Sequence, residues 1–386
     1  MAGRKKKAAI PLQGMRLIRP AQELLERLRH VGTERDRAHN RKLFFDQYIA
    51  LLLLYFFTPA LTSLRGLQNV SNWAQIRRKI GVSRASLSSL SEAAGVFQAK
   101  YLRAVVKELA CQAQPLVRGR EAEALAGLTA VDGSFFAALP RMVWALWHKS
   151  DEKRGVKLHL HFDVLKGVPC DAELTPAACS ETATLRAMLQ AGRLYVVDRG
   201  YACYELFAAI CSAGSSFIGR VKDNTAFEVQ EERPLDDAAR SAGIVRDVII
   251  SRLGTSHHPN HFKQQSLRIV MLETVERKGP TTIWLLTDRF DLPADLVALA
   301  YKHRWSVELF FRWMKCVLGS EHLLSHQENG VLLQMYAAMI VSLLIVLHTG
   351  RKPTKRTFET IQFYLAGWVS DDEFDAHLAS LKAANA

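Results

Sequence analysis

The sequence predicts an α/β protein with an all-α N-terminal region and a β-rich segment inserted in its second half. Three observations lead to this prediction. From about residue 20 to 117, apolar residues recur at helical spacing. Between about 125 and 200, short apolar runs end at polar turns and are followed by a helical segment. From roughly 222 to 290, apolar and alternating runs are separated by Gly, Pro and polar turns, which is typical of strands.

Charge and composition narrow the class of protein. Of the 386 residues, 51 are Lys or Arg and 38 are Asp or Glu, which gives a net charge of +13. This excess favours a polyanionic partner, but charge alone suits nucleic acid, an anionic membrane surface or a ribosomal role equally. The 6 cysteines form no CxxC pair. We therefore expect reduced thiols in a cytoplasmic protein, and neither a disulfide framework nor a zinc site.

We expect no membrane-spanning segment. The basic N-terminus runs into a charged helical segment and lacks the apolar core of a signal peptide. The apolar stretch Tyr48–Phe57 is too short to span a bilayer. Val331–Leu347 is longer, but it contains Gln334 and Ser342 and follows a charged helix. It is therefore predicted to be a buried core helix.

The N-terminal region is predicted to be helical after a basic leader at residues 1–10. Residues 73–93 resemble a helix-turn-helix, with helices at 73–80 and 84–93 and Ser83 as the N-cap of the second. An ordinary helical hairpin with a polar face fits the same residues. The clearest other helices are Glu23–His30, Leu43–Phe57 and Val96–Leu109.

Two aspartates follow short apolar runs. Leu128–Val131 leads to Asp132 in Asp-Gly-Ser, which predicts a strand followed by a turn. Leu194–Val197 leads to Asp198, and a helix is predicted from about Cys203 to Cys211. Carboxylates at strand ends project from the edge of a sheet, where α/β folds bind ligands. An Asp beside Gly is also a common turn former or helix N-cap.

A third acidic residue lies in a helical segment with the spacing Y-x2-R-x3-E-x6-K. At about 100° per residue, the four side chains fall within an arc of roughly 60° on one helix. A carboxylate flanked by cations suits metal-dependent chemistry on a nucleic-acid backbone, although a solvated face with charge pairing has the same pattern. The four residues are Tyr301, Arg304, Glu308 and Lys315. The opposite, apolar face carries Leu299, Leu309, Phe310, Trp313 and Met314.

This spacing, together with VDGS around the first aspartate and DRGY around the second, resembles the YREK-signature family of insertion-sequence DDE transposases. The resemblance extends from about Leu128 to His348. It implies an RNase H-like mixed sheet flanked by helices and interrupted by a β-rich insertion. It also implies that Asp132, Asp198 and Glu308 are the catalytic, metal-binding residues. Two Mg²⁺ or Mn²⁺ ions per active site would be the cofactor, with Asp132 as the bridging ligand.

The resemblance also implies a set of DNA contacts. An aromatic residue at the position of Trp284 stacks on a flipped base in hairpin-forming relatives, whereas the apolar strand around Trp284 equally favours a core position. The other predicted contacts hold phosphates near the cut. They are Tyr301, Arg304, Lys315, Arg199, Tyr201 and Arg220.

The predicted organisation has five parts. Residues 1–120 form a helical DNA-binding region, 121–221 the first part of the catalytic core, 222–290 the β-rich insertion, 291–350 the second part of the core with the YREK helix, and 351–386 a C-terminal helical tail.

The function implied by the family is transposition. The protein would bind the terminal inverted repeats of its element, cleave DNA at the ends and join the 3′-OH to target DNA. Cut-and-paste transposition with a hairpin intermediate and transposition without one both fit the family. A homodimer on DNA, in a synaptic complex, and a bacterial cytoplasmic location at the nucleoid are expected. The alternatives are an RNase H-like metal nuclease without strand transfer and an inactive DNA-binding remnant.

Overall fold

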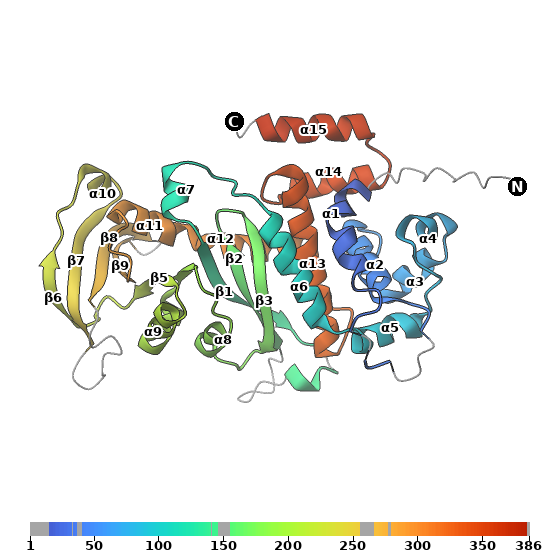
Figure 1. Cartoon of the computed structure of the whole chain (residues 1–386), viewed down its shortest axis with the longest axis horizontal. Helices are drawn as coiled ribbons and strands as arrows, with labels where there is room; N and C mark the ends of the chain where they lie inside the picture. Colours follow the sequence, from blue (N-terminus) through green and yellow to red (C-terminus); the bar gives the residue numbers. More distant parts are fainter. Residues whose placement is uncertain are drawn as a thin grey trace, which may run out of the picture. The chain divides into compact units, whose positions relative to one another are not determined.

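The computed structural model describes residues 15–32, 34–36, 41–139, 141–145, 155–254, 266–276 and 279–383 (Figure 1). The leader predicted at residues 1–10 lies outside the described residues. The chain divides into two compact units. One, which we call the helical unit, combines Met1–Gln112 with Val317–Ala386, and the other, the sheet unit, is Ala113–Cys316.

The helical unit is built around one long buried helix, α13. The described helices of this unit are α1 (Met15–Glu26), α2 (Phe45–Phe57), α3 (Leu64–Ser71), α4 (Ala74–Ile80), α5 (Leu87–Val96), α6 (Ala99–Gln112), α13 (Glu328–Thr349), α14 (Lys355–Leu365) and α15 (Asp371–Ala383). Helix α13 packs against α1, α2, α5 and α6. The side chain of Asn329 fastens its first turn by donating to the carbonyls of Ala94 (2.7 Å) and Phe97 (2.6 Å).

Helix α13 is long and apolar enough to cross a membrane, but 89% of its apolar window is buried within the protein. Its side chains are covered by neighbouring helices instead of lipid, which confirms the predicted core helix. The helix ends at Thr349, and Gly350 follows in the left-handed conformation (φ 66°) that favours glycine.

The predicted helix-turn-helix segment forms two helices, but the second begins later than expected. After α4, Gly81 adopts the left-handed conformation (φ 67°). Helix α5 is capped by Ser86, whose hydroxyl accepts a hydrogen bond from the backbone N–H of Ser89 (3.1 Å). The hydroxyl of Ser83 donates to the carbonyl of Lys42 instead (2.7 Å). The predicted N-cap at Ser83 is therefore wrong, because that side chain is used in a contact with a distant segment.

Two further N-terminal helices differ from their predicted bounds. The helix expected at Glu23–His30 begins earlier, at Met15, and ends at Glu26. The helix expected at Val96–Leu109 begins only at Ala99, because Val96 is still the last residue of α5.

The sheet unit contains a mixed sheet with nine described strands in the order β3-β2-β1-β4-β5-β9-β8-β7-β6. Strands β1 and β2, and β2 and β3, are antiparallel, whereas β4 is parallel to β1 and β5 is parallel to β4. This arrangement of the first five strands confirms the predicted RNase H-like fold. The strands are β1 (Leu128–Ala137), β2 (Gly155–Asp163), β3 (Val168–Pro176), β4 (Leu194–Val197), β5 (Ser216–Val221), β6 (Phe227–Glu232), β7 (Ile244–Leu253), β8 (Leu267–Glu276) and β9 (Gly279–Thr287).

The first strand is longer than the sequence predicts. A turn was expected at Asp132-Gly-Ser, but β1 continues to Ala137 and pairs with β2 along its whole second half. Gly133 is needed for space and not for a turn. A Cβ atom there would lie 2.8 Å from Cδ of Lys157 and 3.0 Å from Oε1 of Glu181.

The inserted strands extend the same sheet. β9 pairs with β5 in antiparallel fashion, and β8, β7 and β6 follow it outward. The β-rich insertion predicted at 222–290 is therefore continuous with the core sheet.

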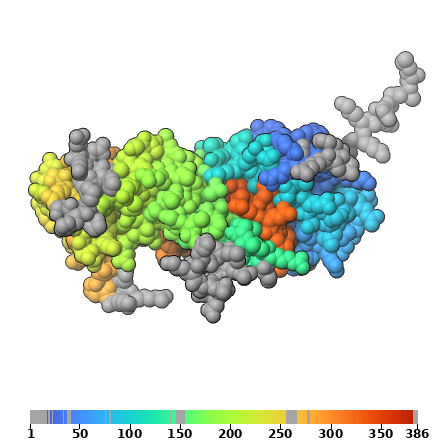
Figure 2. Space-filling view, turned by 90° about the horizontal axis from the view of Figure 1, so that it is seen from below, coloured from blue at the N-terminus to red at the C-terminus, as the bar shows by residue number. Residues whose placement is uncertain are grey.

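Helices cover both faces of the sheet. α8 (Glu181–Ala187) and α9 (Tyr204–Ser212) lie over one face, seen from below in Figure 2, and help bury Val131, Val197 and Phe217. α11 (Ala294–His303) and α12 (Trp305–Arg312) lie over the other face in Figure 1. There the ring of Phe310 packs against that of Phe162, with centroids 5.3 Å apart. The remaining short elements are α7 (Arg120–Ala124), α10 (Asp237–Ser241), η1 (Val143–Ala145), η2 (Arg199–Tyr201) and the π-helical turn η3 (Trp313–Val317).

The domain boundaries differ from the predicted ones at the C-terminal side. Residues 291–350 were expected to complete the catalytic core, but residues from Val317 onward group with the N-terminal helices. The reason is the apolar surface of α13, which is buried by α1, α2, α5 and α6.

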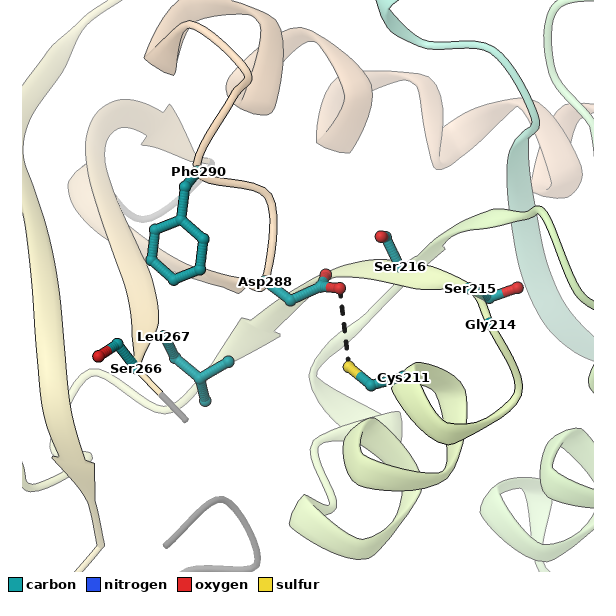
Figure 3. A pocket seen from close by; sticks show the side chains of 8 residues that line it. All are labelled: Cys211, Gly214, Ser215, Ser216, Ser266, Leu267, Asp288 and Phe290. Carbon is teal, nitrogen blue, oxygen red and sulfur yellow. Dashed lines mark hydrogen bonds between the residues drawn. The ribbon is translucent and has the colours of Figure 1, made fainter. Parts of the chain in front are cut away.

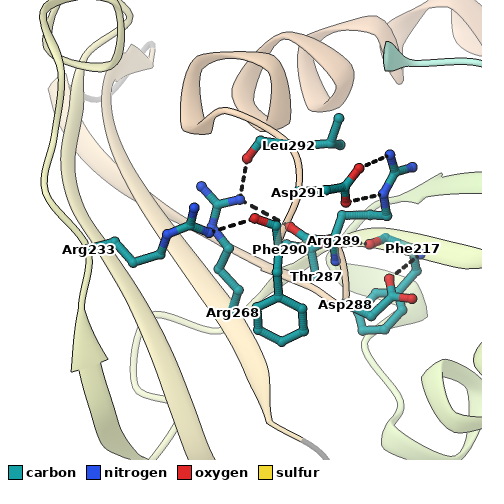
Figure 4. A network of polar contacts seen from close by, with 9 residues as sticks. All are labelled: Phe217, Arg233, Arg268, Thr287, Asp288, Arg289, Phe290, Asp291 and Leu292. Atoms are coloured by element: carbon teal, nitrogen blue, oxygen red, sulfur yellow. Dashed lines mark hydrogen bonds and ion pairs between the residues drawn. The ribbon is translucent and has the colours of Figure 1, made fainter. Parts of the chain in front are cut away.

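A buried arginine, Arg268, fixes the chain just ahead of α11, and Figure 4 shows it beside the loop that leads from β9 to α11. Arg268 of β8 is fully buried, and its guanidinium donates to both carboxylate oxygens of Asp247 on β7, at 2.8 and 2.7 Å. Its Nη1 donates to the carbonyls of Arg289 (3.1 Å) and Leu292 (2.5 Å) in the loop between β9 and α11. The inserted strands therefore hold the start of the helical segment that carries the predicted YREK residues.

We expect Arg268→Met to lower the free energy of unfolding by about 3–5 kcal/mol, because it leaves the buried charge of Asp247 with only the longer ion pair to Arg233 (3.9 Å). Urea denaturation followed by tryptophan fluorescence measures this loss. Replacing both residues, with Asp247→Leu added, should restore much of the stability.

Arg246→Met is the matched control. Arg246 pairs with Glu232 on the neighbouring strand, but their side chains are 40% and 58% exposed. Solvent screens such a pair, so its loss should cost less than about 1 kcal/mol. Equal losses for the two single variants would contradict a special role for the buried pair.

Candidate active site

Two aspartates occupy matching positions on neighbouring parallel strands. The last paired residues of β1 and β4 are Ala130 and Val196. Asp132 and Asp198 each lie two residues further along the chain. Because side chains alternate between the faces of a sheet, both carboxylates project from the same face. Parallel pairing therefore brings together two acidic residues that are far apart in the sequence.

Arg220 continues this row on the next strand. The pairing of β4 with β5 ends at Val197 opposite Gly219. Asp198 and Arg220, the residues that come next, are therefore level with each other. Arg220 projects from the same face of the sheet as Asp198. The structure thus places one of the predicted phosphate contacts beside the two carboxylates.

The carboxylate of Asp132 carries an unfavourable charge. Its Oδ1 accepts a hydrogen bond from the backbone N–H of Gly133 (2.8 Å). The pKa of Asp132 is raised to about 6, mainly by burial and in addition by the negative charges of Glu308 and Asp198, while the Gly133 bond and the charge of Arg304 act in the opposite direction. These effects show that the three predicted acids lie within electrostatic reach of one another.

Glu308 reaches the site from α12, which packs on β1 and β2. It is half-buried, and its Oε1 accepts a hydrogen bond from Nη1 of Arg304 one helical turn earlier (2.7 Å). The guanidinium of Arg304 also lies near the rings of Tyr301 (5.9 Å to the centroid) and Trp305 (5.4 Å). Arg304 therefore neutralises the third carboxylate in this structure.

The helix that carries these residues is not the single straight helix expected from the sequence. α11 ends at His303, α12 begins at Trp305, and a π-helical turn follows from Trp313. The 60° arc of the ideal helix therefore does not hold over the whole segment. Leu309 was expected on the buried apolar face but is 49% exposed, whereas Phe310 is buried.

The π-helical turn directs Lys315 toward β1. Its Nζ donates to the carbonyl of Phe135 (2.5 Å) and lies 4.5 Å from the centroid of the Phe136 ring. Lys315 is thus near the end of the strand that carries Asp132.

The three acids do not form a closed metal site in this structure. Among the residues that the structure describes, no group of three or more His, Cys, Asp or Glu side chains is close enough to hold a metal ion. Burial is the main cause of the raised pKa of Asp132, and the charges of Glu308 and Asp198 add to it, so a cation beside Asp132 would stabilise its charged form. Carboxylate oxygens are the ligands that Mg²⁺ prefers, so the donor set fits a divalent ion if Glu308 exchanges Arg304 for it.

Two residues of the DRGY motif lie in different environments. Arg199 is exposed and accessible to a ligand. Tyr201 is only 1% exposed and belongs to the core beneath the sheet. The predicted contact of Tyr201 with DNA is therefore wrong, because its ring is covered by protein. The side chain of Asp198 caps this turn, with Oδ1 accepting from the N–H of Gly200 (2.7 Å).

Trp284 lies on the face of the sheet opposite Asp132. In β9 it pairs with Val221 of β5, and its ring meets that of Phe227 edge-on (5.6 Å between centroids). It is half-buried and packs against the core under α8 and α9. This environment favours the core position that the sequence left open.

The structure adds residues that the sequence did not single out. Lys157 of β2 and Glu181 of α8 form an ion pair of 2.8 Å across Gly133. Trp305 is 51% exposed beside Arg304. In the sequence, Lys157 is one of several polar residues of β2, and nothing there indicates that it pairs with Glu181.

A pocket of about 480 Å³ lies elsewhere in the sheet unit (Figure 3). It lies at Ser216, where β5 begins, whereas Asp132 and Asp198 lie beyond the last paired residues of β1 and β4. Asp288 in this pocket accepts hydrogen bonds from the Sγ of Cys211 (3.6 Å) and the N–H of Phe217 (2.9 Å). The pocket is therefore separate from the candidate active site.

The fold and the site together define an RNase H-like protein with an acidic site just beyond the paired residues of β1 and β4. Residues 124–344 match the family described as the transposase DDE domain, and the chain belongs to this family. This confirms the predicted insertion-sequence DDE transposase family, whose members generally use divalent metal ions. The four-residue YREK signature stays a prediction.

Two curated relatives carry the same description. The chain is 33% identical over 204 residues to a protein of Sinorhizobium fredii described as the transposase y4zB, covering 52% of this chain and 55% of that protein. It is 27% identical over 225 residues to a Geobacillus stearothermophilus protein described as a transposase for insertion sequence element IS5377, covering 58% and 57%. The chain thus spans about half the length of the curated relatives it matches.

The chain also aligns with a cryo-EM structure of the piggyBac transposase synaptic complex with hairpin DNA. The TM-score is 0.48 at 8% identity, over 97% of this chain and 86% of that chain. A similarity of this size carries no conclusion about function.

The electrostatics of Asp132 lead to a stability prediction. The pKa of Asp132 in the folded protein, about 6, lies above its ordinary value of 3.8, so the folded protein binds the proton of this carboxyl more tightly than the unfolded chain. This favours folding fully below about pH 4, and the gain in stability is lost as the pH rises through 6. Asp132→Asn removes the penalised charge. We expect it to raise the free energy of unfolding by on the order of 1–3 kcal/mol at about pH 7.5, with little change at about pH 4.

Asp163→Asn is the control for this measurement. Asp163 lies on β2, and its carboxylate pairs with Arg193 (3.3 Å). Losing that pair should lower stability at neutral pH. If urea denaturation shows that Asp132→Asn lowers stability in the same way, Asp132 is stabilised by its neighbours and the proposed repulsion is absent.

Proposed function

We propose that this protein is a DNA transposase that binds the terminal inverted repeats of its element, cleaves DNA at the element ends and joins the 3′-OH to target DNA. The observation that carries the proposal is the placement of Asp132 and Asp198 in matching positions on parallel strands, with Glu308 within electrostatic reach. Membership of the transposase DDE domain family supports it.

Asp132, Asp198 and Glu308 would hold two Mg²⁺ or Mn²⁺ ions per active site. When bound, such ions activate an attacking water and stabilise the leaving oxygen in phosphodiester cleavage. Asp132 is the best candidate for the bridging ligand, since both other carboxylates raise its pKa. Its charge is thus close to each of the groups that would complete the two ligand sets.

Arg304 would change partners when DNA binds. In this structure its guanidinium neutralises Glu308. The two non-bridging oxygens of a phosphate offer a charged, bidentate acceptor as a carboxylate does, so Arg304 could turn to the DNA while Glu308 takes up its ligand role. Arg220, Lys315, Tyr301 and the exposed Arg199 would hold phosphates next to the cut and position the strand for attack.

The helical unit would bind the terminal repeats. Its α4 and α5 are consecutive helices separated by a short turn, as a helix-turn-helix requires, and Arg77, Arg78 and Arg84 are exposed around that turn. Pairing of two element ends would require a homodimer on DNA. We assign Trp284 a structural role, because base stacking would require it to leave the core under α8 and α9.

Two alternatives share the same site. A metal nuclease would keep the three carboxylates and cleave without joining. An inactive remnant would bind the repeats but not cut them. A reaction that contains both donor and target DNA separates these possibilities by its products.

We expect Asp132→Ala, Asp198→Ala and Glu308→Ala each to abolish cleavage and joining while leaving the binding of terminal-repeat DNA intact. Loss of one catalytic carboxylate removes an ion ligand, and rates should fall by at least about 10³-fold. Labelled donor DNA, analysed on denaturing gels with Mg²⁺ or Mn²⁺ present, measures both products, and a gel shift measures binding.

The control is Asp223→Ala, which removes an exposed carboxylate from the turn after β5. It should leave cleavage and joining unchanged. Cleavage without joined product by the wild-type protein would support the nuclease, and binding without cleavage would support the remnant. Full activity of any one of the three alanine variants would remove that residue from the proposed set.

A further inference from the structure

Two exposed aromatic rings stack on each other where α14 ends. The rings of Phe363 and Trp368 lie 5.5 Å apart between centroids and are nearly parallel, at 18°. Phe363 is 44% exposed and Trp368 is 76% exposed. The backbone N–H of Trp368 donates to the carbonyl of Phe363 (2.9 Å), which fixes the turn between them. The helical unit therefore presents a preformed aromatic pair to solvent.

Charged residues are segregated on either side of this pair. Residues 351–356 read RKPTKR and carry four cations and no acid, and we call them the basic end. Residues 371–375 read DDEFD and carry four acids and no cation, and we call them the acidic end. Phe363 lies about midway between the two ends in the sequence. Residues 351–386 together contain five Lys or Arg and five Asp or Glu, so this tail has no net charge.

Local structure explains the acidic end but not the basic end. Residues 371–373 form the first turn of α15, where the helix dipole stabilises acids. Lys355 and Arg356 occupy the first turn of α14, where the same dipole opposes cations. Lys355 has Glu359 at 3.7 Å, but both side chains are largely exposed and solvent screens the pair. Two guanidinium nitrogens of Arg351, Nε and Nη2, are buried without a hydrogen-bond partner in the described part of the chain.

A second copy of this chain fits the surface better than DNA does. DNA would be attracted to the basic end, but the acidic end next to the aromatic pair would repel it, and the tail is neutral in a chain of net charge +13. A two-fold pairing satisfies both ends at once, because each basic end then faces the acidic end of the partner. The aromatic pair lies between the ends and would meet its own counterpart near the axis, where aromatic residues carry much of the binding energy.

We propose that α14 and α15 form a homodimer surface that needs no DNA: Phe363 and Trp368 pack against the same pair of a second copy, and the basic end of one protomer lies against the acidic end of its partner. The two helices lie side by side in Figure 1, and the rings of Tyr364 and Phe374 stack between them, 4.2 Å apart between centroids. This contact holds the two ends at fixed positions relative to each other.

An exchange of charges between the two ends tests the proposal. Arg356→Glu and Asp372→Lys each change an exposed residue and place like charges at both contacts of a two-fold dimer. Each should raise the dissociation constant of the DNA-free dimer by about 10-fold or more. A chain with both substitutions restores opposite charges and should return the constant to within about 3-fold of the wild-type value. Sedimentation equilibrium of the full-length protein over a series of concentrations measures these constants.

Trp368→Ala tests the aromatic centre of the surface. It should raise the dissociation constant by about 30-fold or more, as the loss of a central aromatic residue does. Trp73→Ala is the matched control, since Trp73 is a 62% exposed tryptophan of the same unit, just before α4, and its loss should leave the constant unchanged. Because both side chains are mostly exposed, neither change should lower the urea midpoint.

A wild-type protein that stays monomeric throughout the concentration series would overturn this inference. A dimer insensitive to Trp368→Ala, or charge reversals that the double variant does not rescue, would overturn it as well. If Arg356→Glu weakens a gel shift of duplex DNA and leaves the dimer unchanged, the basic end binds DNA and the inference is wrong. Each of these results leaves the proposed cleavage and joining of DNA standing, because the dimer is measured without DNA.

Discussion

The candidate site depends on one constraint, the parallel register of β1 and β4. Because residues in parallel strands advance in step, the pair Ala130 and Val196 determines that Asp132 and Asp198 meet on one face. A shift of one residue would turn one carboxylate into the core under α8 and α9. That core is closely packed with buried apolar side chains, so the slipped arrangement would bury a charge without a partner. The hydrophobic pattern of the two strands therefore fixes their register, and with it the relative positions of Asp132 and Asp198.

The charge balance around this register is incomplete. One guanidinium, that of Arg304, is hydrogen-bonded to Glu308, and the charges of Glu308 and Asp198 both raise the pKa of Asp132. Proteins seldom keep such repulsion in a core unless a ligand relieves it. Asp132 therefore has no cation of its own in the state described, since Arg304 is bonded to Glu308. Local conflicts of this kind are expected at functional sites, where stability is sacrificed for binding.

Sequence reasoning identified the elements whose pattern is local. The strand Leu194–Val197 was predicted with the bounds it has, and the helix after it within one residue, because a short apolar run and a capping turn are contained in a few residues. Helix α13 was recognised for the same reason.

It failed where a distant contact decides the local structure. Gly133 suggested a turn, but it is a residue of a continuous strand that leaves room for Lys157 to reach Glu181. Tyr201 was placed at the DNA because the resemblance of its DRGY motif to the transposase family implied it, but its ring is buried in the core. The π-helical turn at Trp313 breaks the helical period in a way that spacing alone does not reveal.

The inserted strands explain how the third carboxylate can be so distant in sequence. They do not fold apart from the core: β9 returns alongside β5, and this pairing brings the chain back to the sheet. Arg268, which lies within the insertion and is paired there with Asp247, donates to the carbonyls of Arg289 and Leu292. The chain therefore enters α11 from a fixed point, and the packing of Phe310 on Phe162 sets where α12 lies. Two anchors, one polar and one apolar, thus determine the position of Glu308. Because both are buried, the position of this carboxylate depends on the insertion as much as on the core strands that carry the two aspartates.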